Sequence, residues 1–483
     1  MEKHFEKFRK NVIGEKEEFE TPYGKKNIHY FDWTASGRLY HPIEEKMKNV
    51  FGKYVANTHT ESNMTGMTMT KAYHKALSII KDHVGANEQD VIITEGTGVT
   101  GVINKLQRML GLKIHETFKE RVMISEKERP VVFITHMEHH SNHTSWLETI
   151  CKVVVIPSNE EGNVDLKAFK QLLEEEKERT MKIGSFTACS NVTGIETPYH
   201  TLAKMMHENG GICIVDFAAS APYVEINMHP NDKMEKIDAL VFSPHKFLGG
   251  PGTCGVLIFD SALYRNSVPD IPGGGTVNWT NPWGGKQYIS NIEEREDGGT
   301  PGFLQAIRTA LSIQLKEKMG MENMKVQKEM LTSFLLEGLE PIPNLHILAK
   351  NATNRLGIVS FYSEIIPYNM MVKILNDRYG IQVRGGCSCA GTYGHYLLNI
   401  NQEKSKEITD LLNQGHADKK PGWVRISLHP IMNKEDIKYI IKAINEIQQN
   451  AEEIKKDYIR ILNTNEYEHK KQQEITIDDW FKI

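Results

Sequence analysis

Two cysteines separated by a single residue, Cys387 and Cys389, lie in a glycine-containing stretch of the chain. A thiol on such a loop can act as a nucleophile, and a pair of thiols can also bind a metal or form a redox couple. A metal site would need further ligands at matching spacing, and only His395 stands near. We therefore predict a reactive thiol, with two inert cysteines as the alternative.

A lysine stands in a second segment suited to covalent chemistry, residues 243–252 (SPHKFLGGPG). Lys246 follows an apolar run that reads as a buried strand, where desolvation and nearby charge lower the pKa of an amine. Its neighbours Ser243 and His245 could donate to a phosphate. Asp216 ends an earlier apolar run, and a carboxylate buried there needs a cation or hydrogen-bond donors. It could pair with a protonated ring nitrogen or a metal, or it could cap a helix.

A glycine-rich segment, residues 96–101 (GTGVTG), follows another strand-like run and opens a helix-like one. Backbone amides at such a helix N-terminus bind phosphate, and the spacing fits the dinucleotide-binding pattern. A dinucleotide site also needs an acidic residue about 20 positions on, at the end of the next strand. The glutamates after this segment fall before that strand, so we keep phosphate binding and rank a nicotinamide dehydrogenase last. A glycine turn without a ligand is the alternative.

Four histidines fall within residues 136–143 (HMEHHSNH), again after a strand-like run. Neutral imidazole is a common zinc ligand, but the spacing matches neither HExxH nor its inverted form. A histidine at the end of a strand can also stack on a ring or transfer protons. We predict no metal site, and metal ligation and plain surface histidines stay open as alternatives.

These segments must be positioned by a common framework. Seven apolar, β-branched runs alternate with amphipathic stretches, at residues 91–94, 131–135, 152–156, 183–188, 212–216, 239–243 and 255–259. Nearly continuous apolar runs are typical of strands covered on both faces. The pattern predicts an α/β fold with a large, mostly parallel, seven-stranded sheet.

The pattern of predicted helices and strands changes after residue 302. A long helical stretch at 304–337 is followed by strands mixed with helices: strands at 355–361, 380–384 and 423–428, and helices near 370–378 and 434–458. This mixture predicts a smaller α+β domain. We place a large domain at residues 24–317 and a small C-terminal domain at 318–483, joined by residues 1–23. Residues 464–483 are polar and are predicted to form a loose tail.

Composition narrows the classes of protein. The chain has 483 residues, with 58 Lys plus Arg against 62 Asp plus Glu, a formal net charge of −4. That balance argues against a nucleic-acid or polybasic membrane binder, and the apolar runs are too short to cross a bilayer. The first residues are charged and lack an apolar signal segment, so the cytoplasm is the default expectation. Six cysteines cannot form a disulfide framework in a chain of this length.

Taken together, the motifs resemble the class V branch of fold-type I pyridoxal-phosphate enzymes, and within it the cysteine desulfurase and selenocysteine lyase group. The resemblance rests on residues 30–36, 137–142, 190–194, 215–216, 243–246, 299–301 and 383–390, which occur in the order of the family. It extends from about residue 28 to 445.

The resemblance implies pyridoxal 5′-phosphate as cofactor and a role for each matching residue. Lys246 would bond to the cofactor and move the substrate's α-proton, Asp216 would pair with the pyridinium nitrogen, and His139 would stack on the ring and transfer protons. Further cofactor contacts would come from Thr97, Gly98, Thr100, Asn191, Ser243 and His245. Thr300 would reach the cofactor of a neighbouring subunit, which implies a homodimer.

The same resemblance implies the substrate and the reaction. Asn191, Arg384 and Arg425 would bind the amino-acid substrate, with Arg425 on its carboxylate. The thiolate of Cys389 would attack the sulfur of L-cysteine, leaving a persulfide on the enzyme and releasing L-alanine. A sulfur-acceptor protein is then a possible partner.

Three departures from the group keep other functions open. Ala219 stands where the group usually has Gln or His, Cys387 stands where a histidine is common, and extra residues separate Cys389 from Arg425. The alternative is a class V aminotransferase, or a pyridoxal-phosphate lyase or epimerase, acting on another amino acid. A sulfur-carrier or metal-binding protein without turnover is a third hypothesis.

Overall fold

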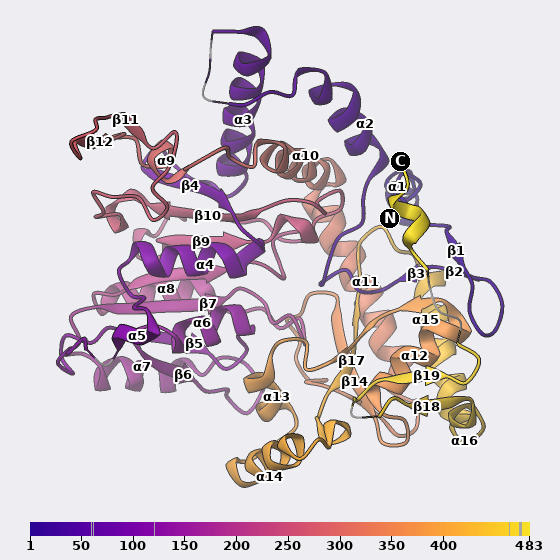
Figure 1. Ribbon diagram of the computed structural model, residues 1–483. Helices are drawn as coiled ribbons and strands as arrows, with labels where there is room; N and C mark the ends of the chain where they lie inside the picture. Colours follow the sequence, from indigo (N-terminus) through magenta and orange to yellow (C-terminus); the bar gives the residue numbers. More distant parts are fainter. Residues whose placement is uncertain (59, 61, 120, 463, 473–475) are drawn as a thin grey trace.

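A seven-stranded sheet organises the larger part of the computed structural model, which describes residues 1–483 except 59, 61, 120, 463 and 473–475 (Figure 1). Its order is β4-β10-β9-β8-β7-β5-β6. All neighbouring pairs are parallel except those of β10, which runs against β4 and β9. The strands are β4 (Asp90–Glu95), β5 (Val131–Thr135), β6 (Lys152–Ile156), β7 (Lys182–Thr187), β8 (Ile212–Asp216), β9 (Ala239–Phe242) and β10 (Gly255–Asp260). The predicted α/β sheet is confirmed, and each predicted strand lies within one residue of the observed one.

Both faces of this sheet are covered, which explains the continuous apolar runs. In β5, Val131 and Phe133 enter one core while Val132 and Ile134 enter the other. Helices α3 (Met64–His83), α7 (Leu166–Glu175), α8 (Tyr199–Glu208) and α10 (Phe303–Met319) contribute to the first core, and α4 (Gly98–Met109) contributes to the second.

The smaller part holds an antiparallel sheet in the order β13-β14-β17-β16, with strands β13 (Leu345–Ile347), β14 (Ile358–Ser363), β16 (Arg384–Gly386) and β17 (Trp423–Ser427). Helices α11 (Met321–Leu339), α12 (Tyr368–Tyr379) and α15 (Lys434–Gln449) share its core, where α1 (Glu2–Arg9) also buries Phe5 and Phe8. The N-terminal strand β3 (His29–Tyr30) pairs in parallel with β15 (Ile381–Gln382). The domain boundary at residues 317 and 318 stays a prediction, and α10 runs across it.

The structure differs from the predicted elements at a few places. The helix predicted at 304–337 is broken into α10 and α11 at Gly320, whose φ of 84° lies in the left-handed region that ends helices. The strand predicted at 380–384 is divided into β15 and β16, because the chain changes its pairing partner from β3 to β17. Part of the predicted loose tail is ordered, since β19 (Tyr467–His469) pairs with β18 (Tyr458–Arg460).

The other α-helices and strands lie outside the two main sheets and the helices named above. They are α2 (His41–Asn49), α5 (Glu116–Lys119), α6 (Thr144–Leu147), α9 (Ile292–Glu296), α13 (Gly391–Leu397), α14 (Gln402–Asn413), α16 (Ala451–Ile454), β1 (Glu18–Phe19), β2 (Lys26–Asn27), β11 (Val277–Thr280) and β12 (Lys286–Tyr288). Within the described residues, we find no helix whose length and apolar character would let it span a bilayer.

Candidate active site

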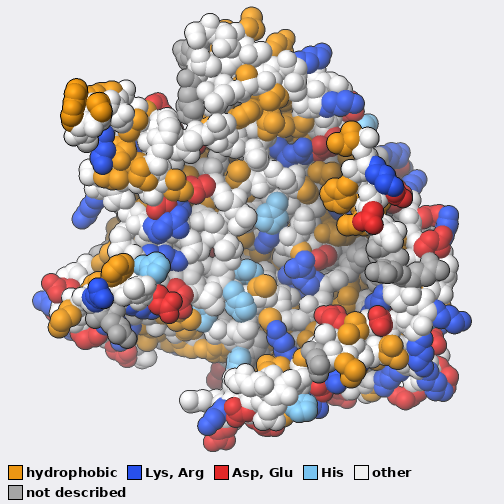
Figure 2. Space-filling model, viewed as in Figure 1, with side chains coloured by type: hydrophobic (Ala, Val, Ile, Leu, Met, Phe, Trp, Pro, Cys, Tyr) orange, Lys and Arg blue, Asp and Glu red, His pale blue; other side chains and the backbone are white. Residues whose placement is uncertain are grey.

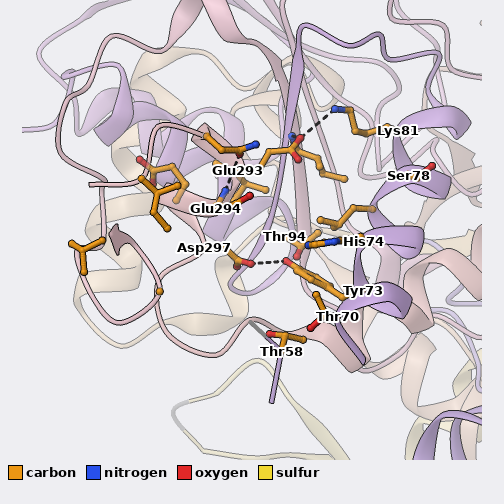
Figure 3. Close-up of a pocket in the computed structure, with 18 residues that line it drawn as sticks. Thr58, Thr70, Tyr73, His74, Ser78, Lys81, Thr94, Glu293, Glu294 and Asp297 are labelled. Carbon is orange, nitrogen blue, oxygen red and sulfur yellow. Dashed lines mark hydrogen bonds and ion pairs between the residues drawn. The ribbon is translucent and has the colours of Figure 1, made fainter. Parts of the chain in front are cut away.

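Two of the cavities are candidates for the functional site. One of about 730 Å³ lies between α3, β4 and α9 (Figure 3), and none of the predicted site residues lines it. Its polar side chains bind one another: Tyr73 donates to Asp297 at 3.0 Å, and Lys81 lies 3.2 Å from Glu293. The other cavity, of about 190 Å³, collects most of the predicted residues, so we take it as the candidate active site.

The second cavity lies where the chain leaves the carboxyl ends of several strands, the usual place for ligands in open α/β sheets. The predicted residues that line it are Thr97, Thr100, His139, Asn191, Asp216, Ser243, His245, Lys246, Arg384, Cys389 and Arg425. Figure 2 shows histidine side chains gathered near the middle of this face, between the large sheet and the region of α13 and α14.

A polar cradle that could hold an anion lies at the start of α4. Gly98 has φ +60°, and a Cβ placed on it would lie 2.7 Å from Ser243 Oγ and 3.1 Å from the His245 ring. The amide of Val99 donates to Ser243 Oγ at 2.9 Å, which fixes the loop after β9 against this helix. The glycine therefore lets backbone amides and two polar side chains face one small space. That donor set suits an anion at a helix N-terminus.

Lys246 and Asp216 form the charged centre of the cavity. Burial lowers the pKa of Lys246 to about 8, against the opposing attraction of Asp216. Burial raises the pKa of Asp216 to about 6, although the Ala218 amide donates to its Oδ1 at 2.8 Å. A cationic ring nitrogen beside this buried carboxylate would offset its desolvation cost. The Lys246 amine could thus react with the aldehyde group of a pyridine aldehyde, and the Asp216 carboxylate could pair with its ring nitrogen.

His139 is held as a neutral imidazole. Burial, together with the nearby charge of Lys246, lowers its pKa to about 3. The Ser141 amide donates to His139 Nδ1 at 3.1 Å, so the proton of the neutral ring is on Nε2. A neutral, partly buried ring can stack on a flat ligand and donate from Nε2.

The loop that carries Cys389 is fastened to the large sheet. Ser388 and Cys389 have φ values of 52° and 56°, which non-glycine residues rarely adopt. The Asn191 side chain donates to the Ser388 carbonyl at 2.7 Å, and the His140 amide donates to the Cys389 carbonyl at 2.7 Å. His140 Nε2 also accepts from the Gly391 amide at 3.0 Å. Cys389 is thereby exposed yet lines the cavity of Lys246.

Two arginines line the cavity on the side of the smaller sheet, and one aspartate outside the lining pairs with both. Arg425 is only 3% exposed and donates to the Asn191 carbonyl at 3.1 Å and to Asp32 Oδ1 at 2.8 Å. Arg384 donates to Asp32 Oδ2 at 3.1 Å. The sequence reasoning did not select Asp32, although it lies inside the 30–36 motif; only its contacts indicate a role.

Several predicted features lie apart from this centre. Thr300 is exposed on the loop after α9, outside the cavity of its own chain. Ala219 lines the cavity, whereas Cys387 does not and packs against the main core. The extra residues after Cys389 form α13 and α14, joined by a 2.8 Å contact between His395 and Ser405. Among the described residues, no three His, Cys, Asp or Glu side chains are arranged to hold a metal.

Comparison with known proteins identifies a family to which the sequence matches. The model of the family described as aminotransferase class-V matches residues 29–440. A probable cysteine desulfurase of Pyrococcus abyssi is 28% identical over 365 residues, which are 75% of this chain and 84% of that protein. One of Staphylococcus epidermidis is 27% identical over 387 residues, covering 79% and 87%.

Solved structures share the fold. An apo cysteine desulfurase of Thermococcus onnurineus superimposes with a TM-score of 0.73 at 24% identity, covering 92% of this chain and 98% of that one. The Escherichia coli cysteine desulfurase CsdA gives 0.67 at 21% identity, covering 87% and 94%. At these identities the likeness is one of fold.

Proposed function

The chain belongs to the class-V aminotransferase family, and on that premise we propose that it is a pyridoxal-phosphate-dependent cysteine desulfurase that converts L-cysteine to L-alanine. One observation carries the choice of reaction: an exposed thiol, Cys389, lines the same cavity as the buried amine of Lys246. The names of the similar proteins from Pyrococcus abyssi and Staphylococcus epidermidis support it.

The cavity offers a place for each part of the cofactor. Gly98, Ser243 and His245, with the start of α4, would hold the phosphate, and Thr97 and Thr100 flank that cradle. Asp216 would face the ring nitrogen. Pyridoxal phosphate, when bound through Lys246, supplies an electron sink for charge that develops at the α-carbon of an amino acid.

The chain's own residues would then bind the substrate and move its protons. The buried guanidinium of Arg425 is placed for the substrate carboxylate, and Asn191, whose main-chain carbonyl accepts from Arg425 at 3.1 Å, lines the same cavity. Lys246 has a pKa of about 8, so near neutral pH its amine can both accept and return a proton. His139 would donate a hydrogen bond from Nε2 as a neutral ring, because its pKa is about 3.

Cys389 would carry out the sulfur transfer. Its thiolate attacks the sulfur of the bound cysteine, a new S–S bond forms, and the C–S bond breaks with its electron pair moving to the substrate carbon. A proton completes L-alanine, so that L-cysteine and the Cys389 thiol give L-alanine and a Cys389 persulfide. An external dithiol or an acceptor protein then removes the outer sulfur and restores the thiol.

We also propose a homodimer in the cytoplasm, a compartment that keeps thiols reduced. Thr300 is exposed and outside its own cavity, as a residue that serves a second subunit would be. Large apolar side chains are exposed at the start of α3, Met64 (65%), and on the β11–β12 hairpin, Trp279 (52%) and Trp283 (88%), and Figure 1 shows this hairpin beside α9. Such exposed aromatic groups are enriched at protein interfaces.

The decisive experiment is mass spectrometry of the reconstituted enzyme after a brief exposure to L-cysteine. We expect one additional sulfur atom on the peptide that contains Cys389, with L-alanine formed in equal amount. Cys387→Ala is the matched control, because that thiol lies outside the cavity, and it should still form the persulfide. Pyruvate or another keto acid without any persulfide would instead favour the lyase or aminotransferase alternative.

A further inference from the structure

Asp32 joins two arginines that the antiparallel sheet places directly opposite each other. Arg384 on β16 and Arg425 on β17 are cross-strand partners in register. Asp32 Oδ1 accepts from Arg425 at 2.8 Å, and Asp32 Oδ2 accepts from Arg384 at 3.1 Å. Each carboxylate oxygen thus serves one arginine. The aspartate reaches this place because the bridge between Asp32 and Ser427 lays the N-terminal segment alongside β17.

Like charges directly opposite each other repel, and burial strengthens the repulsion because water screens it less. Arg425 is 3% exposed, whereas the Arg384 side chain is 49% exposed. Without Asp32, two positive charges would face the cavity from one pair of strands. With Asp32, the trio carries a net charge of +1.

The other charged groups of the cavity leave that balance unchanged. Before the cofactor binds, Lys246 and Asp216 have opposite charges, and their pKa values of about 8 and about 6 keep both ionised near pH 7. In the reconstituted enzyme both would be engaged by the cofactor. His139 and His245 have pKa values of about 3 and about 4, lowered mainly by burial, so both are neutral there. Tyr30, which lies near the trio, has its pKa raised to about 12 by burial and is neutral.

We propose that Asp32 is a specificity-determining residue, which sets the carboxylate-binding corner to a single net positive charge and so selects amino acids with one carboxylate over those with two. The inference rests on the proposed function in that the ligand is an amino acid. Asp32 does not line the cavity, so it acts through Arg384 and Arg425. A single substrate carboxylate balances the charge of the trio, and the second carboxylate of a dicarboxylic amino acid would add an unbalanced negative charge.

The test compares the binding of L-alanine and L-aspartate to the reconstituted enzyme, followed by the change in visible absorbance of the bound cofactor. The wild-type enzyme should prefer L-alanine. In Asp32→Asn the freed Arg384 adds one positive charge, so the ratio of the two dissociation constants should shift toward L-aspartate by about tenfold or more. A purely structural role of Asp32 would weaken both ligands alike and leave the ratio unchanged, which would overturn the proposal.

A double variant tests the charge itself. Asp32→Asn combined with Arg384→Gln returns the corner to +1, so the ratio should move back toward that of the wild type. Asp436→Asn is the matched control, because it removes a carboxylate from another arginine pair, Arg9–Asp436, away from the cavity. A control that shifts the ratio as Asp32→Asn does would count against the proposal.

Two further outcomes separate this inference from the proposed function. If Asp32→Asn fails to fold, Arg384→Gln alone lowers the corner to zero net charge and should weaken L-aspartate more than L-alanine; equal affinities to the wild type would refute the inference. If the wild-type enzyme binds L-alanine with the predicted selectivity but forms no persulfide from L-cysteine, the desulfurase function fails and the inference stands. An enzyme that binds neither amino acid refutes both.

Discussion

The side-chain amide of Asn191 donates a hydrogen bond of 2.7 Å to the main-chain carbonyl of Ser388, which is 197 residues away in the sequence. The amide of His140 makes an equivalent bond to the carbonyl of Cys389. Both bonds hold the loop by its main chain and do not involve the Cys389 side chain, which is exposed and lines the cavity. The loop is thus fixed while its thiol stays free to react.

The His140 side chain should keep this loop in place. In His140→Ala the Gly391 amide loses its acceptor, which costs about 1 kcal/mol and loosens the loop with little change in global stability. We expect faster alkylation of Cys389 by iodoacetamide and slower sulfide release from L-cysteine. His346→Ala, an exposed histidine away from the cavity, is the control and should change neither rate. Unaltered alkylation in His140→Ala would show that the contact does not position the loop.

Lys246→Ala should abolish the visible absorbance of the bound cofactor, and retention of that band in the variant would exclude Lys246 as its attachment site.

Because the amine of Lys246 has a pKa of about 8, it is mostly protonated below that pH and cannot attack an aldehyde. The rate at which the cofactor-free wild-type protein regains absorbance with pyridoxal phosphate should rise about tenfold per pH unit below 8 and level off above it. Stopped-flow spectroscopy at constant ionic strength measures this profile. A midpoint near the ordinary lysine value of 10.5 would contradict it.

Gly98→Ala should weaken cofactor binding. The new methyl group would lie 2.7 Å from Ser243 Oγ, and a φ of +60° costs a non-glycine residue about 1–2 kcal/mol. We expect the dissociation constant for pyridoxal phosphate to rise about tenfold or more in equilibrium dialysis. Gly111→Ala separates strain from crowding, because Gly111 also has a positive φ but nothing within 4 Å of its added Cβ. Gly98→Ala should lose at least as much stability as Gly111→Ala, and equal loss of cofactor affinity in the two variants would refute the cradle.

Trp283→Ser should weaken the proposed homodimer. The side chain is 88% exposed, so its removal costs the single chain little, whereas loss of a buried interface tryptophan typically costs about 2 kcal/mol or more of binding. Sedimentation equilibrium should show a higher dissociation constant for the variant. Trp480→Ser, a 79% exposed tryptophan near the C-terminus, is the control. Identical association of wild type and Trp283→Ser would remove the β11–β12 hairpin from the interface.

Lys105→Ala should destabilise the fold strongly. The buried amine lies within 4 Å of Glu95, Glu296 and Asp270, and removing it leaves carboxylates without their cation, at a cost of about 3–5 kcal/mol. Urea unfolding followed by circular dichroism measures the change. Arg108→Ala removes an exposed partner of Asp270 and should cost less than about 1 kcal/mol. Equal effects of the two variants would contradict the role given to burial.

The large sheet and the polar side chains at its edge could be predicted from the sequence. Strands covered on both faces must be nearly continuous in apolar residues, so each of the seven appeared as a run with clear limits. Lys246, Asp216 and His139 follow such runs, and the ends of parallel strands meet at one edge. The positions of these side chains at the ends of predicted strands were therefore enough to predict that they lie close together.

Contacts between distant segments could not be predicted from the order of the strands. Nothing local indicates that Asp32 pairs with Arg384 and Arg425, 352 and 393 residues away, because the pairing depends on where the N-terminal segment crosses the smaller sheet. The residue types alone leave Cys387 and Cys389 equivalent, and only the resemblance to the family selects Cys389. The left-handed backbone at residues 388 and 389 and the hydrogen bonds from Asn191 and His140 direct only Cys389 into the cavity. The sequence alone determined the α/β framework and the types of polar side chains at its edge, and the tertiary structure decided which of these side chains share one cavity, because that depends on long-range packing.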